Sequence, residues 1–239
     1  MTNAVVGALG AALGLAAHDL AIGALTDDRP LRPLKGVCPE CGHERGWRRV
    51  RCPECGRVIQ REPVVAVVSA LVAVGFANTV GATWLLIPYL GFLGLSTALL
   101  VTDLEVYRIV NRLNIRGTLL AAALLAASAL AVSDPSGLLR GLAGAAAYFA
   151  GAAILWLVVR GRGFGAGDVK LAAQLGLFTA FVSWGALAWA VFATAMIGGV
   201  VAVGLVMTGA ARMKTELPYG PPMILGAWLA IILTGLGSV

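Results

Sequence analysis

Two aspartates of this chain are placed where a carboxylate could do chemistry. Asp103 ends a long apolar run, and Asp168 follows Gly165 and Gly167 at the start of another. An ionisable side chain at membrane depth is costly and is therefore a functional candidate. Two carboxylates that meet in a low-dielectric site cannot easily both ionise, so one holds a proton while the other accepts one from water. Such a pair can activate water against a peptide carbonyl and protonate the leaving nitrogen.

Each aspartate also has a purely structural explanation. Asp168 could be the N-cap of a helix, a position that aspartate favours and where it meets the positive end of the helix dipole. Asp103 could simply end a helix and pair with Arg108. Other catalytic arrangements have little support, because the chain contains only two histidines, His18 and His43. Two histidines are too few to support a nucleophilic Ser/His pair or a catalytic metal site built from histidines.

The elements that must position these aspartates are membrane helices. The chain has 239 residues, of which 59% are hydrophobic and 13% are charged, whereas a soluble domain carries roughly a quarter charged residues. The apolar residues come in blocks long enough for transmembrane helices, which take about 20 residues each. A soluble all-α core would need charged residues interleaved at helical spacing, and most of the chain lacks them.

The apolar blocks predict an all-α bundle of about eight transmembrane helices. The first block lacks a basic region ahead of it and a small-residue cleavage site after it, so a retained helix is favoured over a signal peptide. An apolar block of 40 residues is too long for one span and divides near Ser183, which makes the sixth helix short. The predicted helices cover about 5–25, 63–80, 83–102, 118–132, 138–159, 168–182, 185–210 and 221–236.

The basic residues give the bundle an orientation. The net charge is +6, but the 18 Lys and Arg are confined to the loops at 26–62, 103–117, 160–170 and 212–216, with Arg140 as the exception. Alternating the helices brings these loops to one face, which the positive-inside rule makes cytoplasmic. We therefore expect a bilayer rather than a nucleic acid as the partner of this charge.

All four cysteines lie in the first polar loop, in two nearly identical Cys-Pro-Glu-Cys-Gly knuckles. Paired CxxC turns can complete a tetrahedral four-thiolate zinc site of the zinc-ribbon kind. Disulfides are the alternative, but they are rare in a reducing cytosol. We expect a structural zinc, and three regions: a first helix at 1–25, a small cytoplasmic zinc-ribbon-like loop at 26–62 and a membrane domain at 63–239. The expected zinc ligands are Cys38, Cys41, Cys52 and Cys55.

Several motifs together resemble the prepilin peptidase (type IV leader peptidase) family of GxGD membrane aspartyl proteases. They are the stretch from Gly165 to Leu171, an Asp-Leu-Glu motif at Asp103 followed by Arg108-Ile109-Val110-Asn111, the paired cysteine knuckles, and Pro218-Tyr219-Gly220-Pro221 before the last helix. The resemblance covers nearly the whole chain. Carried over by position, it implies Asp103 and Asp168 as the catalytic pair and, as supporting residues, Gly165, Gly167, Glu105 and Lys170.

The resemblance also implies a substrate and a location. The family removes the short basic leader of type IV prepilin-like precursors, after a glycine and just before an apolar helix, at the cytoplasmic face of the bacterial inner membrane. Many members then N-methylate the new amino terminus with S-adenosylmethionine, for which Asp19 and the cysteine loop are the candidate contributors here. A non-enzymatic transporter or metal-sensing membrane protein, with Asp103 and Asp168 lining an ion path, is the alternative.

Overall fold

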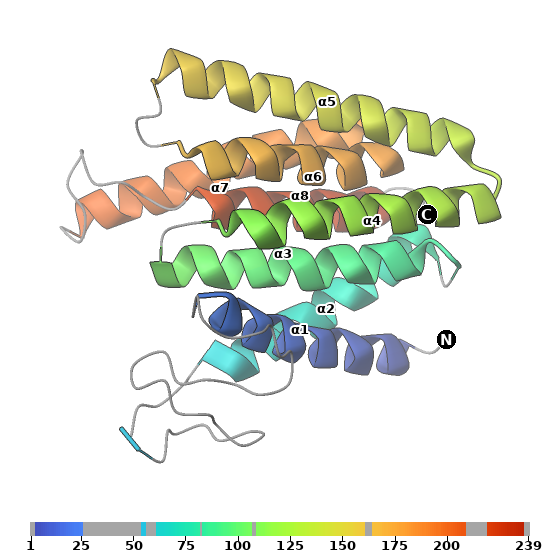
Figure 1. Ribbon diagram of the computed structural model, residues 1–239, viewed down its shortest axis with the longest axis horizontal. Helices are drawn as coiled ribbons and strands as arrows, with labels where there is room; N and C mark the ends of the chain where they lie inside the picture. The colour runs from blue at the N-terminus through green and yellow to red at the C-terminus, as the bar shows by residue number, and fades with distance from the viewer. Residues whose placement is uncertain are drawn as a thin grey trace.

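The computed structural model describes residues 3–25, 54–55, 61–81, 83–106, 109–160, 164–208 and 219–236. Within these ranges the protein is all-helical and has no strand. The helices run side by side along the long axis of the molecule (Figure 1). Their bounds are α1 Asn3–Leu25, α2 Arg61–Val80, α3 Leu86–Val106, α4 Asn111–Ala131, α5 Pro135–Val158, α6 Ala166–Val182, α7 Trp184–Met207 and α8 Gly220–Leu236. The prediction of an all-α bundle is confirmed.

Six of the described helices, α1 to α5 and α7, are long and apolar enough to cross a membrane. The remaining two, α6 and α8, have 17 residues each, or about 25 Å at 1.5 Å per residue. Large apolar side chains stand exposed around the bundle, Leu71 and Leu139 at 68% and Val200 at 73% among them. Exposed apolar surface on this scale is expected of a protein whose solvent is lipid. The chain is a multi-pass membrane protein.

The prediction that residues 103–117 form a loop is wrong for most of that segment. Helix α3 continues through Asp103 to Val106, and α4 already begins at Asn111. The charges of this segment mark where the apolar surface ends. They do not end the helices, because a helix satisfies its own backbone hydrogen bonds in lipid and in water alike.

Glycines set the closest helix contacts. On α5 and α6, a Cβ at Gly144 would stand 2.1 Å from the Cβ of Ala180, and a Cβ at Gly176 would stand 2.5 Å from the carbonyl oxygen of Gly144. Helix α1 approaches α2 in the same way at Gly10 and Gly14. In lipid, the hydrophobic effect does not drive helices together. Small residues at the interface instead let the helix backbones approach closely enough to pack.

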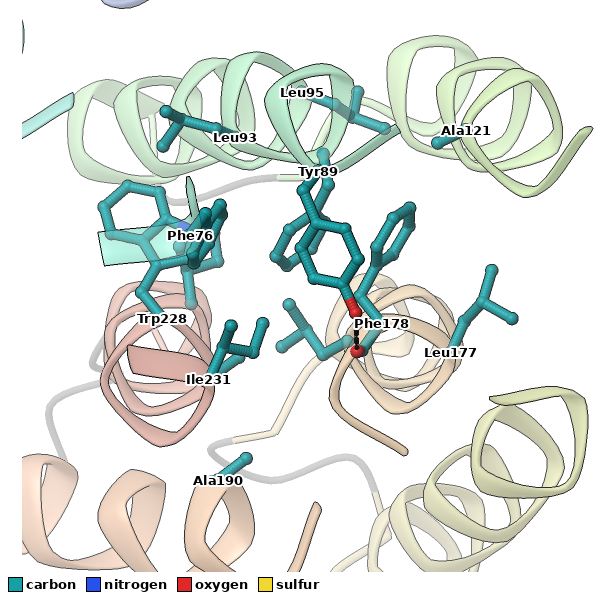
Figure 2. Packing of buried hydrophobic residues seen from close by; sticks show 14 of the residues in the cluster. Phe76, Tyr89, Leu93, Leu95, Ala121, Leu177, Phe178, Ala190, Trp228 and Ile231 are labelled. Atoms are coloured by element: carbon teal, nitrogen blue, oxygen red, sulfur yellow. Dashed lines mark hydrogen bonds between the residues drawn. The ribbon is translucent and has the colours of Figure 1, made fainter. Parts of the chain in front are cut away.

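A cluster of aromatic side chains joins α2, α3 and α6 (Figure 2). Phe92 stacks on Phe178 with ring centroids 4.4 Å apart, and Phe76 lies at 6.0 Å from Phe92. The Tyr89 hydroxyl donates to the carbonyl oxygen of Phe178 at 2.8 Å, as a buried phenol must find a partner. Helix α8 is tied in where the Trp228 indole N–H donates to Ser96 at 3.0 Å.

Arg140, the basic residue outside the clusters, lies near the start of α5 and binds the end of α6. Its Nε donates to the carbonyl oxygen of Ala180 at 2.8 Å, and its Nη2 donates to those of Phe181 and Val182. The last carbonyls of a helix lack intrahelical partners, and an arginine can supply them. Arg140 therefore closes α6 at the end of the bundle where α5 begins.

The three-region division at 1–25, 26–62 and 63–239 stays a prediction. Between residues 26 and 60, only Glu54 and Cys55 belong to the described residues, and both are exposed in a turn; Arg61 and Glu62, predicted as part of the loop, already belong to α2. Cys38, Cys41 and Cys52 lie outside the described residues.

Candidate active site

Asp103 lies on α3, one turn before the helix ends, and only 4% of its surface is exposed. Its Oδ2 accepts a hydrogen bond from the backbone N–H of Gly220, the first residue of α8, at 3.2 Å. A Cβ at Gly220 would stand 2.6 Å from that oxygen, so only glycine allows this approach. The positive end of the α8 dipole therefore faces the Asp103 carboxylate.

Asp168 lies in the first turn of α6 and is 7% exposed. Its Oδ2 accepts a hydrogen bond at 2.9 Å from the backbone N–H of Gly165, the N-cap residue. Asp168 is therefore not the N-cap itself, because it stands at the third helical position. Gly167 also makes room, since a Cβ there would be 3.0 Å from the Cβ of Ile109.

The structure brings these two carboxyl groups together. The ends of α3, α4, α6 and α8 that carry Asp103, Asn111, Asp168 and Gly220 gather at one end of the bundle, on the left in Figure 1. The carboxyl group of Asp168 acts electrostatically on that of Asp103. Among the described residues each carboxylate has one hydrogen-bond partner, through Oδ2. No described residue donates to Oδ1 of either carboxyl group, so a water molecule or a substrate could bind there.

Of the supporting residues, Gly165 and Gly167 lie at this site, whereas Lys170 points to another helix. Its Nζ donates to Oδ1 of Asn111 at 2.9 Å and so joins α6 to the start of α4. Two residues along a helix is a rotation of about 200°, which separates the Lys170 side chain from that of Asp168. Glu105, two residues beyond Asp103 on α3, is half-buried. Arg108, the predicted partner of Asp103, lies outside the described residues.

A cavity of about 460 Å³ lies beside the aspartates, between α5, α7 and α8. Phe164 and Tyr219, the residues directly before the two glycine donors, both line it. Burial raises the pKa of the Tyr219 phenol, and the nearby Asp168 carboxylate adds to the rise. The phenol therefore remains a neutral hydrogen-bond donor. Gly220, Tyr219 and Phe164 were not among the predicted site residues, although Pro218-Tyr219-Gly220-Pro221 was part of the resemblance.

Comparison with known proteins identifies a family. The model of the type IV leader peptidase family matches residues 89–203, a range that includes both aspartates. A prepilin leader peptidase/N-methyltransferase of Bacillus subtilis is 31% identical over 198 residues, which cover 83% of this chain and 71% of the relative.

Proteins with the same name from two other organisms are similar to this chain at comparable identity. The protein of Myxococcus xanthus is 30% identical, and the match covers 82% of this chain and 61% of the relative. That of Aeromonas hydrophila is 26% identical, with 83% of this chain covering 71% of it. No solved structure matches the chain significantly. The chain belongs to the type IV leader peptidase family.

Proposed function

We propose that this protein is an aspartic endopeptidase that removes the short basic leader of prepilin-like precursors, with Asp103 and Asp168 as its catalytic pair. The observation that carries the proposal is the meeting of two buried carboxylates from α3 and α6 at one end of the bundle. The names of the relatives supply the substrate class, since they are prepilin leader peptidases. They also disfavour the transporter or metal-sensing alternative.

The chemistry requires one proton between the two carboxyl groups. The ionised carboxylate takes a proton from water as the water oxygen bonds to the carbonyl carbon of the scissile peptide. The protonated carboxyl group donates its proton to the leaving nitrogen, and the C–N bond breaks. One water is consumed, and a new carboxyl terminus and a new amino terminus are released without a covalent enzyme intermediate. The backbone N–H that donates to each Oδ2 keeps both carboxylates oriented, and the water would bind at the Oδ1 atoms, to which no described residue donates.

Co-expression of the full chain with a prepilin carrying a C-terminal tag tests the proposal. We expect the tagged protein to shift to a smaller size, and mass spectrometry to place the new amino terminus directly after the basic leader. Asp103→Ala should abolish the shift while the variant remains in the membrane at the wild-type level. An unprocessed prepilin in the presence of the wild-type chain would refute the function. Full processing by Asp103→Ala would refute the assignment of this residue.

We also propose that the site end of the bundle faces the cytoplasm, in the bacterial inner membrane. All the basic residues except Arg140 fall in segments that the alternation of helices brings to this end, and such clustering is typical of cytoplasmic loops. Reporter fusions test it: a fusion after residue 110 should behave as cytoplasmic and one after residue 134 as external. The reverse pattern would overturn the orientation.

Zinc in the cysteine loop is a further part of the proposal. Cys38, Cys41, Cys52 and Cys55 would hold it, and four thiolates fill a tetrahedral sphere and leave no open position for water. The metal would therefore brace the loop and take no part in peptide hydrolysis. We expect about one zinc ion per purified chain, lost in a Cys38→Ser/Cys41→Ser variant. A wild-type chain without zinc would contradict this.

N-methylation with S-adenosylmethionine rests on the names of the relatives alone. Among the described residues that line the cavity, none is charged, so none of them would pair with the amino and carboxylate groups of the methionyl part of that cofactor. Asp19 is half-buried on α1, and three of the four cysteines lie outside the described residues. Mass spectrometry of the processed amino terminus decides the question, because a methylated terminus would support the second activity and an unmodified one would remove it.

A further inference from the structure

We propose that the cavity between α5, α7 and α8 is the subsite for the apolar segment that directly follows the scissile bond. This inference rests on the proposed function and adds where the substrate binds. Three features carry it: the position of the cavity next to both aspartates, the chemistry of its lining, and its opening toward the lipid.

The cavity begins one residue away from the backbone donor of each carboxylate. Phe164 precedes Gly165, whose N–H holds Asp168, and Tyr219 precedes Gly220, whose N–H holds Asp103. The two aromatic rings contact each other edge to face, with centroids 5.4 Å apart and planes at 77°. A peptide bond held at the aspartates would therefore have this aromatic pair, and the cavity behind it, directly at its side.

The lining is suited to apolar side chains. It is made of small and aliphatic residues, including Ala152, Leu187 and Met223, with Tyr148 and Thr194 as its polar members besides Tyr219. Its volume of about 460 Å³ falls within the roughly 300–1,000 Å³ of ligand pockets. The described residues that line it include no Lys, Arg, Asp or Glu, so none of them offers the basic leader an opposite charge. The cavity selects the part of the substrate on the apolar side of the cut.

The cavity is open toward the surface that faces lipid. On α5, Gly151 and Leu155 are exposed, and on α7, Val191 and Ala195 are exposed. Helices α5 and α7 have little contact with each other, because α5 packs mainly on α6. A segment that already lies in the bilayer can thus enter between α5 and α7 without crossing water. Its leader would remain at the basic end of the bundle, on the other side of the aspartates.

Gly151 allows the cavity to be filled. A Cβ at this position would meet no atom within 4 Å, so Gly151→Leu adds bulk without displacing backbone. Gly204 on α7 provides the matched control, because its Cβ would also meet nothing within 4 Å and it does not line the cavity. The substrates are two prepilins that differ only in the first residue after the scissile bond, phenylalanine or alanine.

We expect Gly151→Leu to lower the ratio of kcat/KM for the phenylalanine over the alanine substrate by about tenfold, which is what a few methylene groups decide in an apolar pocket. Gly204→Leu should keep the wild-type ratio. An unchanged ratio in Gly151→Leu, or the same fall in Gly204→Leu, would overturn the subsite and leave the peptidase function standing. Failure of the wild-type chain to cut either substrate would instead overturn the proposed function.

A cross-linking experiment distinguishes the substrate from a lipid tail as the occupant. A photoreactive amino acid replaces Ala195 in an Asp168→Asn chain, which holds its substrate uncut, in membranes that contain the phenylalanine prepilin. We expect the cross-link to map to the first residues of the apolar segment of the substrate. A cross-link to lipid alone, or to the basic leader, would contradict the proposal.

Discussion

Asp134 and Asp168 stand at the starts of consecutive helices, at opposite ends of the bundle, and each accepts an N–H from a residue three positions away. Asp134 is the N-cap of α5; it accepts from Gly137 N–H and from the Ser136 hydroxyl, both at 2.8 Å, and is only half-buried. Asp168 accepts from Gly165, its one donor among the described residues, and is buried beside Asp103. Asp134 is thus an N-cap that accepts from the third helical residue, whereas Asp168 is a third helical residue that accepts from the N-cap and is proposed to be catalytic.

The surroundings make the difference. At the Asp134 end, Arg140 provides a nearby positive charge and satisfies the last carbonyls of α6. At the other end, the Asp103 carboxylate faces the like charge of Asp168. A capping carboxylate lowers the energy of its helix when ionised, whereas two neighbouring carboxylates compete for one proton. Burial and the neighbouring group, more than the hydrogen bond, assign each aspartate its role.

The largest expected effect comes from neutralising the two aspartates in parallel. Asp168→Asn should lower kcat/KM for prepilin cleavage by roughly 10⁴-fold, the order seen when one member of a catalytic group is removed. Asp134→Asn makes the same chemical change at a helix start and should keep kcat/KM within about twofold, since it lies far from the site. Cleavage assays on purified chains in detergent measure both. Equal losses of kcat/KM in the two variants would contradict the different roles of Asp134 and Asp168.

The next effect concerns the glycine that holds Asp103. Gly220→Ala places a Cβ against Oδ2, at 2.6 Å before any adjustment, so the carboxylate or the start of α8 must shift. A misplacement of about 1 Å can cost on the order of 100-fold in rate, and we expect a fall of that size in kcat. Gly94→Ala on α3 is the control, because its Cβ would meet nothing within 4 Å. A Gly220→Ala chain with normal kcat would show that the close contact is not needed.

Arg140 should matter for stability and little for the chemistry. Arg140→Met removes the donors to the last carbonyls of α6, and leaving such groups unsatisfied costs about 1–3 kcal/mol. We expect a lower midpoint of thermal unfolding in detergent, with near-normal kcat in the protein that remains folded. A normal midpoint would contradict the capping role, and a loss of kcat without a change in midpoint would link this end of the bundle to the reaction.

The smallest expected effect is the pH dependence that Asp134 contributes. The Gly137 N–H, then the Ser136 hydroxyl, lower the pKa of Asp134 below its usual value. A lowered pKa in the folded state stabilises at pH values above the unfolded-state pKa, and the contribution is lost as the pH falls through the folded-state value. The difference in unfolding midpoint between wild type and Asp134→Asn should therefore shrink below about pH 4. A constant difference down to pH 2 would contradict the assignment.

Much of the fold could be predicted from the apolar blocks, because lipid exposure demands long apolar helices. The number of helices was predicted correctly, and the short sixth helix was placed close to its observed bounds. The ends of α3 and the start of α4 could not be predicted, since charged residues mark the membrane boundary and say little about where a helix ends. Only the cap geometry at Gly165 shows that Asp168 is at the third helical position.

The site was predictable to the extent that it lies within short motifs. The motif around Asp168 and the acid pair at Asp103 and Glu105 mark two segments that the structure brings together at Asp103 and Asp168, and their catalytic role stays a prediction. The contact of Gly220 with Asp103 joins residues more than a hundred positions apart, so the spacing of residues along the chain does not predict it. The same holds for the aromatic pair Phe164 and Tyr219.

The central claim is that the two carboxylates act as a unit. Single-turnover cleavage of one prepilin by Asp103→Asn, by Asp168→Asn and by the double variant, each in excess over substrate and each verified as folded, tests it most directly. We expect three equally inactive proteins, because neither group alone can both activate water and protonate the leaving nitrogen. Cleavage by either single variant at more than about a tenth of the wild-type rate, with the double variant inactive, would contradict it.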